Sequence, residues 1–77
     1  MALYVDLLNK IIRESDLSKM GLTVRAVSRE NHFALLISKR EWIEASAYHN
    51  IFLTDEVNKV MTRCNATGMK VSLEVVE

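Results

Sequence analysis

The segment from Met69 to Val76 alternates between apolar and polar side chains, and this pattern constrains the fold more than any other in the chain. Apolar residues occupy every second position from Met69 to Val75, and Lys70, Ser72 and Glu74 lie between them. Side chains two positions apart share one face of a β-strand, so the segment predicts a strand with one dry and one wet face. Because a dry face needs a covering layer, we expect a sheet packed on helices.

The length of 77 residues predicts a single domain spanning 1–77. An apolar fraction of 49% and a charged fraction of 26% are typical of a folded globular chain. The one cysteine, Cys64, cannot form an intramolecular disulfide, which favours a reducing compartment. No apolar run approaches the roughly 20 residues of a membrane span, and the N-terminus lacks a basic signal-peptide start. We therefore expect a cytoplasmic protein that does not bind membranes.

Two stretches have the apolar spacing of amphipathic helices. In residues 2–16, apolar side chains recur at three- and four-residue steps with polar ones between them. The second helix is expected from Thr54, whose hydroxyl can cap it, to the region of Gly68. Its apolar stripe at i, i+3, i+4 and i+7 consists of Val57, Val60, Met61 and Cys64.

A β-hairpin is expected between these helices. Gly21 can supply a left-handed turn before a strand over residues 22–28, and a polar turn leads to a second strand over 32–38. In this second strand Phe33 and Ile37 alternate with Ala34 and Leu36, so both faces are apolar. A strand that is apolar on both faces is typically central in its sheet.

Residues 39–53 are ambiguous between helix and strand. Ser38 and Glu41 have the spacing of a capping box, which favours a helix over 39–48. The alternation that follows favours an extended segment over 50–53, with Ile51–Leu53 as a candidate fourth strand. The predicted fold is thus a two-layer α+β domain of order α-β-β-α-α-β, with a small, mainly antiparallel sheet.

No group of residues has the spacing of a catalytic or metal site. His32, His49 and Cys64 are far apart in the sequence, and one cysteine with two histidines does not match the close ligand pairs of zinc sites. The neighbouring carboxylates at positions 41 and 44 and at 55 and 56 fall where negative charge favours a helix start. With two glycines, the chain cannot form a Gly-rich phosphate loop. We expect no catalytic residues, no cofactor and no metal, and therefore no enzyme.

The charges cancel overall but are segregated along the chain. Ten basic and ten acidic residues give a net charge of zero. Residues 17–40 are basic, with Glu30 as their only acid, whereas residues 41–56 contain acids and no lysine or arginine. A nucleic-acid-binding regulator is the alternative that this basic segment suggests, although phosphate-binding proteins usually carry a clear positive excess. The basic side chains it would use are Arg25, Arg29, Lys39 and Arg40.

The sheet carries more apolar side chains than one covered face can hide. If Phe33, Leu35 and Ile37 face the helices, the apolar side chains left on the opposite face are Val27, Ala34, Leu36 and Val76. A partner would bury this surplus and would also support the small core. We therefore predict a protein-binding module that acts as a homodimer, regulator, inhibitor or accessory subunit. The predicted contact residues are Ala34, Leu36, Trp42 and Tyr48, with Arg25 and Arg40 as charges at the rim.

Overall fold

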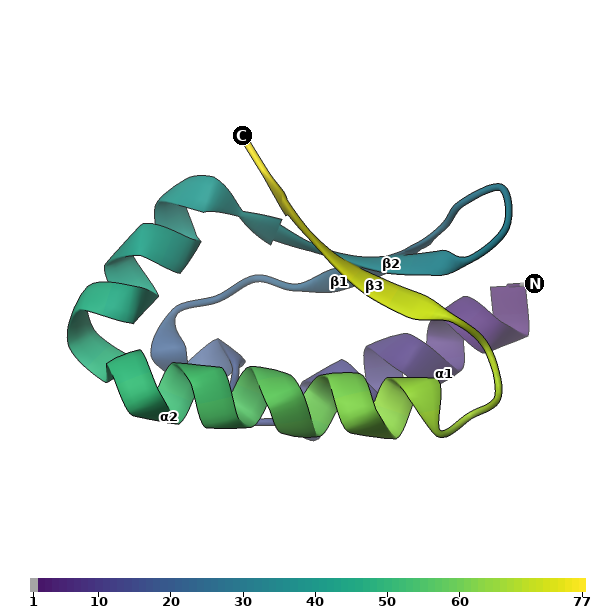
Figure 1. Ribbon diagram of the computed structural model, residues 1–77, viewed down its shortest axis with the longest axis horizontal. Coiled ribbons are helices and arrows are strands. Elements are labelled where there is room, and N and C mark those ends of the chain that lie inside the picture. The colour runs from purple at the N-terminus through teal and green to yellow at the C-terminus, as the bar shows by residue number, and fades with distance from the viewer. Residues whose placement is uncertain (1) are drawn as a thin grey trace.

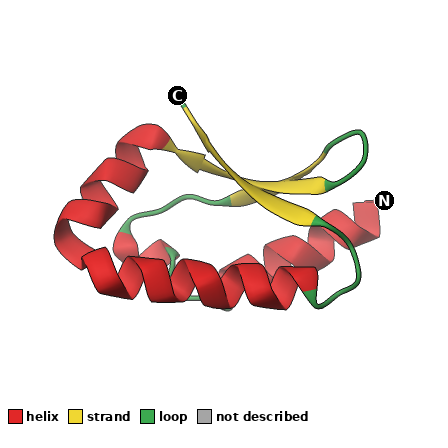
Figure 2. Ribbon diagram, in the orientation of Figure 1, coloured by secondary structure: helices red, strands yellow, loops and turns green. Residues whose placement is uncertain are grey.

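The computed structural model describes residues 2–77 and shows two helices packed on one face of a three-stranded sheet (Figures 1 and 2). The predicted α+β fold is confirmed. The elements in chain order are α1 (Ala2–Arg13), the 3-10 turn η1 (Ser18–Met20), β1 (Arg25–Ser28), β2 (Phe33–Ser38), α2 (Lys39–Asn65) and β3 (Val71–Val76).

The sheet has the order β1-β2-β3, so the predicted central position of residues 33–38 is confirmed. β1 pairs antiparallel with β2, and β2 pairs parallel with β3, with Phe33 opposite Val71. The sheet is therefore mixed, where we expected it to be mainly antiparallel. The reason is the connection: α2 returns the chain to the end of the sheet where β2 begins, and helical crossovers of this kind join parallel strands.

The core lies between the sheet and the helices. Phe33, Leu35 and Ile37 project from β2 into this layer, and each is at most 1% exposed. The ring of Phe33 stacks on that of Tyr4 in α1, with 4.7 Å between the ring centroids. The helices contribute further buried apolar side chains, namely Leu8, Ile11, Ile12, Leu53, Val57, Val60 and Cys64.

Residues 39–65 form α2, which consists of two helical halves that meet at a kink, so the extended segment that we expected between two helices is absent. The bend is at Asn50, whose backbone angles (φ 14°, ψ −89°) are not helical. Ile51–Leu53 is helical and does not form a fourth strand. Thr54 is inside the helix and donates its hydroxyl to the Asn50 carbonyl oxygen (3.3 Å), so it is not an N-cap. Beyond the kink, Leu53 is buried at i−4 from Val57, so it belongs to the apolar stripe of the second half of α2.

The ends of the helices also differ in detail from the prediction. α2 begins at Lys39 as predicted, but the Ser38 side chain makes no capping hydrogen bond. The Glu41 carboxylate instead accepts hydrogen bonds from the backbone N–H (2.8 Å) and the hydroxyl (3.3 Å) of Thr23, tying α2 to the loop before β1. α1 ends at Arg13, three residues earlier than expected. Gly21 has the predicted left-handed conformation, with φ of 84°.

Candidate functional site

The β1 edge of the sheet is closed by a side chain of α1. Arg29 donates its backbone N–H to the His32 carbonyl oxygen (2.8 Å), so the backbone groups of Arg29 point toward the second arm of the hairpin. Because these directions alternate along a strand, the backbone groups of Ala26 point away from β2. The outward N–H of Ala26 donates to Oδ1 of Asn9 (3.0 Å). β1 is also only four residues long and packs against α1. Short length and a covering helix are common ways of protecting an edge strand.

The β3 edge is closed only at its first residue. Phe33 donates its N–H to the Lys70 carbonyl oxygen (3.0 Å), so the backbone groups of Val71, Leu73 and Val75 face away from β2. The Asn65 side chain accepts from the N–H of Val71 (3.1 Å) and donates to its carbonyl oxygen (3.3 Å), as a neighbouring strand would. Within residues 2–77, no hydrogen bond reaches the outward groups of Leu73 or Val75.

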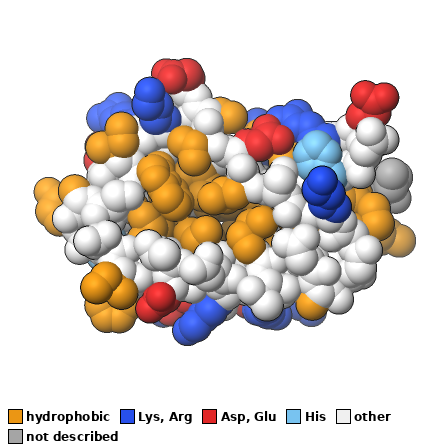
Figure 3. Space-filling view, viewed as in Figure 1, with side chains coloured by type: hydrophobic (Ala, Val, Ile, Leu, Met, Phe, Trp, Pro, Cys, Tyr) orange, Lys and Arg blue, Asp and Glu red, His pale blue; other side chains and the backbone are white. Residues whose placement is uncertain are grey.

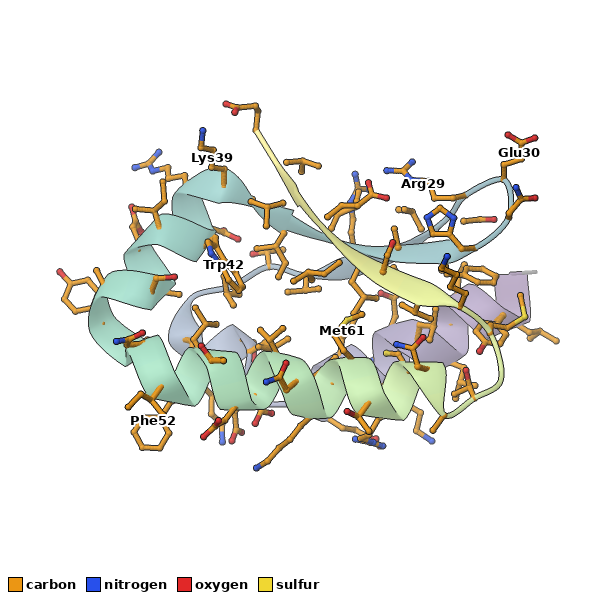
Figure 4. The ribbon with its side chains drawn as sticks, viewed as in Figure 1. Arg29, Glu30, Lys39, Trp42, Phe52 and Met61 are labelled. Atoms are coloured by element: carbon orange, nitrogen blue, oxygen red, sulfur yellow. The ribbon has the colours of Figure 1, made fainter. Side chains whose placement is uncertain are left out.

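An apolar hollow lies beside this open edge. Figure 3 shows apolar side chains gathered in a depression between β3 and α2. Trp42 from the first half of α2 and Met61 from its second half point into this space (Figure 4). Both pack against the core and are partly exposed, as is Leu73 of β3. The floor is an apolar crevice too narrow for a water molecule, lined by Leu17, Val24, Leu35, Ile37, Val57, Val60, Met61 and Leu73.

The bend of α2 exposes a second group of apolar side chains. Tyr48 is 84% exposed, Ile51 73% and Phe52 74%. Figure 4 shows Phe52 pointing away from the sheet. These side chains extend the apolar surface beyond the hollow, but they belong to α2 and offer no strand edge beside them.

The predicted interface residues lie on three separate surfaces. Arg25 and Leu36 are paired neighbours on the open face of the sheet, in a shallow depression with Val76. Trp42 lies at the apolar hollow, and Tyr48 lies at the bend of α2. The structure therefore does not bring these residues into one patch.

Two of the predicted residues are less available to a partner, one because it is buried and the other because its charge is paired. Ala34 is 0% exposed, so it offers no surface to a partner in this arrangement. Arg40 is exposed but lies 3.4 Å from the Glu44 carboxylate on the same helix. Sequence reasoning missed the β3 edge, with Met61, Leu73 and Val75. The alternation over 69–76 identified the strand, but not that it would lie at the edge of the sheet.

An ion pair spans the open face of the sheet. The Arg29 guanidinium donates to both Glu74 carboxylate oxygens, at 2.8 and 3.3 Å, from the hairpin across β2 to β3. The hydrogen bond and the charge of Glu74 raise the pKa of Arg29. The hydrogen bond from Arg29 lowers the pKa of Glu74, and the positive charge of Arg29 adds to this effect.

Most of the basic residues that suggested a nucleic-acid site are paired with carboxylates. Besides Arg29, Lys39 lies 3.5 Å from Glu77 and Arg40 lies close to Glu44. Arg25 is the one of the four without an ion pair among residues 2–77. These carboxylates would repel a phosphate backbone, so the structure gives no specific support to nucleic-acid binding.

We predict that acidification weakens the fold partly through Glu74. The pKa of Glu74 is lower in the folded than in the unfolded state. The ion pair of Glu74 with Arg29 therefore stabilises the fold fully at pH values above the unfolded-state pKa of Glu74. That stabilisation is lost as pH falls through the folded-state pKa. Urea unfolding between pH 7 and about pH 3 should show a smaller loss for Glu74→Gln than for the wild type. Glu30→Gln, at the tip of the hairpin, should keep the wild-type profile, and equal profiles for all three proteins would contradict the prediction.

Cys64 is predicted to be unreactive in the folded chain. Its side chain is 0% exposed, and burial raises the pKa of the thiol, so the nucleophilic thiolate is disfavoured. A chromogenic aromatic disulfide, which releases a coloured thiolate when it reacts with a cysteine, should therefore label Cys64 only as the chain unfolds in urea. Labelling in native buffer at the rate found in urea would contradict this burial.

The structure offers no metal cluster or membrane span in the part of the chain that it describes. Within residues 2–77, no three His, Cys, Asp or Glu side chains are grouped closely enough to hold a metal ion. None of the helices described there is long and apolar enough to cross a bilayer. No protein-family model, curated protein or solved structure matches this chain. The open edge of β3 with its apolar hollow is the candidate site.

Proposed function

We propose that this chain is a protein-binding module that receives an extended segment of its partner along the edge of β3. The observation that carries this proposal is the position of unpaired backbone groups, at Leu73 and Val75, directly beside the apolar hollow. In strand addition, backbone hydrogen bonds supply affinity and pockets for alternate side chains supply specificity. The edge and the hollow provide these two components side by side.

The different treatment of the two sheet edges supports the proposal. Asn9 accepts from one outward N–H of β1 and α1 packs against that strand, and Asn65 closes the start of the β3 edge. An open strand edge is a hazard that folded proteins normally remove. The stretch from Leu73 to Val75 is the part of the two edges whose open backbone groups lie beside an apolar hollow, and binding an extended segment is a function that this combination supports.

The proposal can be tested by selecting peptides from a displayed random library with the full chain. Selected peptides should bind the wild type and lose at least about tenfold in affinity for Val75→Pro, because proline removes the outward N–H donor. The fold should tolerate this change, since the N–H of Val75 does not face β2 and proline is accepted at such edge positions. Circular dichroism of the variant checks that point.

Two further variants make the result specific to this site. Trp42→Ala truncates a side chain of the hollow and should also weaken binding. Phe52→Ala truncates an exposed side chain at the bend of α2 and should leave binding unchanged. A selection that yields no peptide, or only peptides that bind Val75→Pro as well as the wild type, would overturn the proposed function.

A further inference from the structure

The helical layer of this fold is wider than its sheet. Two packed helices occupy about 16–20 Å across their axes. Three strands span only about 14 Å, whereas four would span about 19 Å. α1 packs against β1, and α2 packs against β3 and β2. The part of the helical layer that has no strand above it therefore lies on the β3 side. The apolar hollow lies at that place, between β3 and α2 (Figure 3).

A second copy of β3 does not fit this space. α2 packs against β3 and lies with it on the near side of the molecule in Figure 1. If two copies joined their β3 edges in one sheet, their α2 helices would lie about 5 Å apart, which is one strand spacing. Packed helices need about 8–10 Å between their axes. The space therefore fits a strand that brings no helix of its own under the same face.

The Asn65 side chain limits the length of the added strand. Because it occupies both outward backbone groups of Val71, pairing can begin only beyond that residue. Leu73 and Val75 are the outward-facing residues of β3 that remain. Two such positions correspond to a short paired segment of about five residues, since outward groups recur at every second residue.

The faces of β3 specify the side chains of the added strand. Leu73 and Val75 are paired with Leu35 and Ile37, which face the helices, so residues opposite them would point into the hollow. Apolar side chains suit those two positions. The residue between them would point to the open face beside Glu74. The Glu74 carboxylate accepts two hydrogen bonds from Arg29 and has further lone pairs, so it can still accept from a basic neighbour on the added strand.

We infer that the partner supplies a lone extended segment in which a basic residue lies between two apolar residues. This inference rests on the proposed function and adds the chemistry of the ligand. The central sequence is nearly symmetric, so it serves a parallel or an antiparallel added strand equally.

The probe for this inference is the synthetic peptide acetyl-Thr-Ser-Val-Lys-Val-Ser-Thr-amide, titrated into the ¹⁵N-labelled chain. The amides of Leu73 and Val75 should shift most and should exchange with solvent more slowly when the peptide is bound. A Ser-Lys-Ser version should bind at least about tenfold more weakly, because it lacks the apolar side chains. A Val-Glu-Val version should bind about threefold more weakly, because it places a second carboxylate beside Glu74.

Glu74→Gln provides the matched control in the protein. It should abolish the preference for the lysine peptide over the glutamate peptide, while Glu44→Gln on α2 should leave that preference unchanged. Equal binding of the Val-Lys-Val and Ser-Lys-Ser peptides, or a lysine preference that survives Glu74→Gln, would overturn the inference.

Failure of the inference can be distinguished from failure of the proposed function. Library peptides that depend on Val75 but lack the apolar-basic-apolar pattern would overturn the inference and leave the function standing. A dimer seen by sedimentation and lost in Val75→Pro would do the same, because it would show that a second copy fits the edge. Absence of any ligand that depends on Val75 would overturn both.

Discussion

Replacing Phe33 with alanine is expected to leave the chain unfolded at 25 °C. Phe33 is 1% exposed, lies on the central strand and stacks on Tyr4. Truncating a buried phenylalanine costs about 3–5 kcal/mol, through lost transfer free energy and the cavity that remains. A single core in a domain of this size supplies about the same amount, roughly 3–5 kcal/mol in total. The substitution should therefore remove most or all of the free energy of unfolding.

The other phenylalanine provides a matched control. Phe52 is 74% exposed at the bend of α2, so Phe52→Ala should change the free energy of unfolding by no more than about 0.5 kcal/mol. Urea unfolding followed by circular dichroism and by Trp42 fluorescence measures both variants. A cooperative transition of Phe33→Ala at the wild-type midpoint would contradict the described core.

Replacing Asn65 with alanine is expected to destabilise the fold by about 1–3 kcal/mol, because two half-buried backbone groups of Val71 lose their partners. The side-chain amide donates to the carbonyl oxygens of Met61 (2.9 Å) and Val71 (3.3 Å), and its oxygen accepts from the N–H of Val71. One side chain thus joins the end of α2 to the start of β3. Its loss should also speed the amide exchange of Val71.

Asn58→Ala is the matched control for this prediction. Asn58 is exposed on the same helix, and its side chain makes no hydrogen bond within residues 2–77. We expect a change of about 0.5 kcal/mol or less for this variant. Asn65→Asp keeps the acceptor for the Val71 N–H and loses the donor, so it should fall between the wild type and Asn65→Ala. Equal stabilities of the Asn65 and Asn58 variants would rule out the bridging role of Asn65.

The parts of the fold that sequence reasoning predicted are those set by local periodicity. The alternation over 69–76 gave β3, and the i, i+3, i+4 and i+7 stripe of Val57, Val60, Met61 and Cys64 gave the second half of α2. The break near Asn50 was predicted, but the helical conformation of the residues after it was not, because Ile51 and Phe52 are exposed apolar residues. Because three apolar residues follow one another there, the sequence pattern did not reveal that Leu53 alone is buried.

The candidate site was less predictable than the fold, because an edge is a property of the whole sheet. The free backbone groups of Leu73 and Val75 follow from the position of β3 beside β2, and no local pattern encodes that position. The same holds for the hydrogen bonds that join the side chains of Asn9 and Asn65 to the sheet edges, which depend on how each helix lies. Trp42 was predicted as a contact residue on its aromatic character alone. The structure places it at the hollow, and its contact role stays a prediction.

The packing of α2 against β3 has a consequence for association between copies of the chain. Exposed strand edges promote aggregation, because the unpaired backbone groups of one copy can pair with an edge strand of the next. In this molecule the helix beneath β3 keeps the edges of two like molecules from meeting in register. If the proposed ligand binds there, this packing and the charge of Glu74 would let part of the sheet stay open to an extended segment while discouraging edge-to-edge pairing of copies.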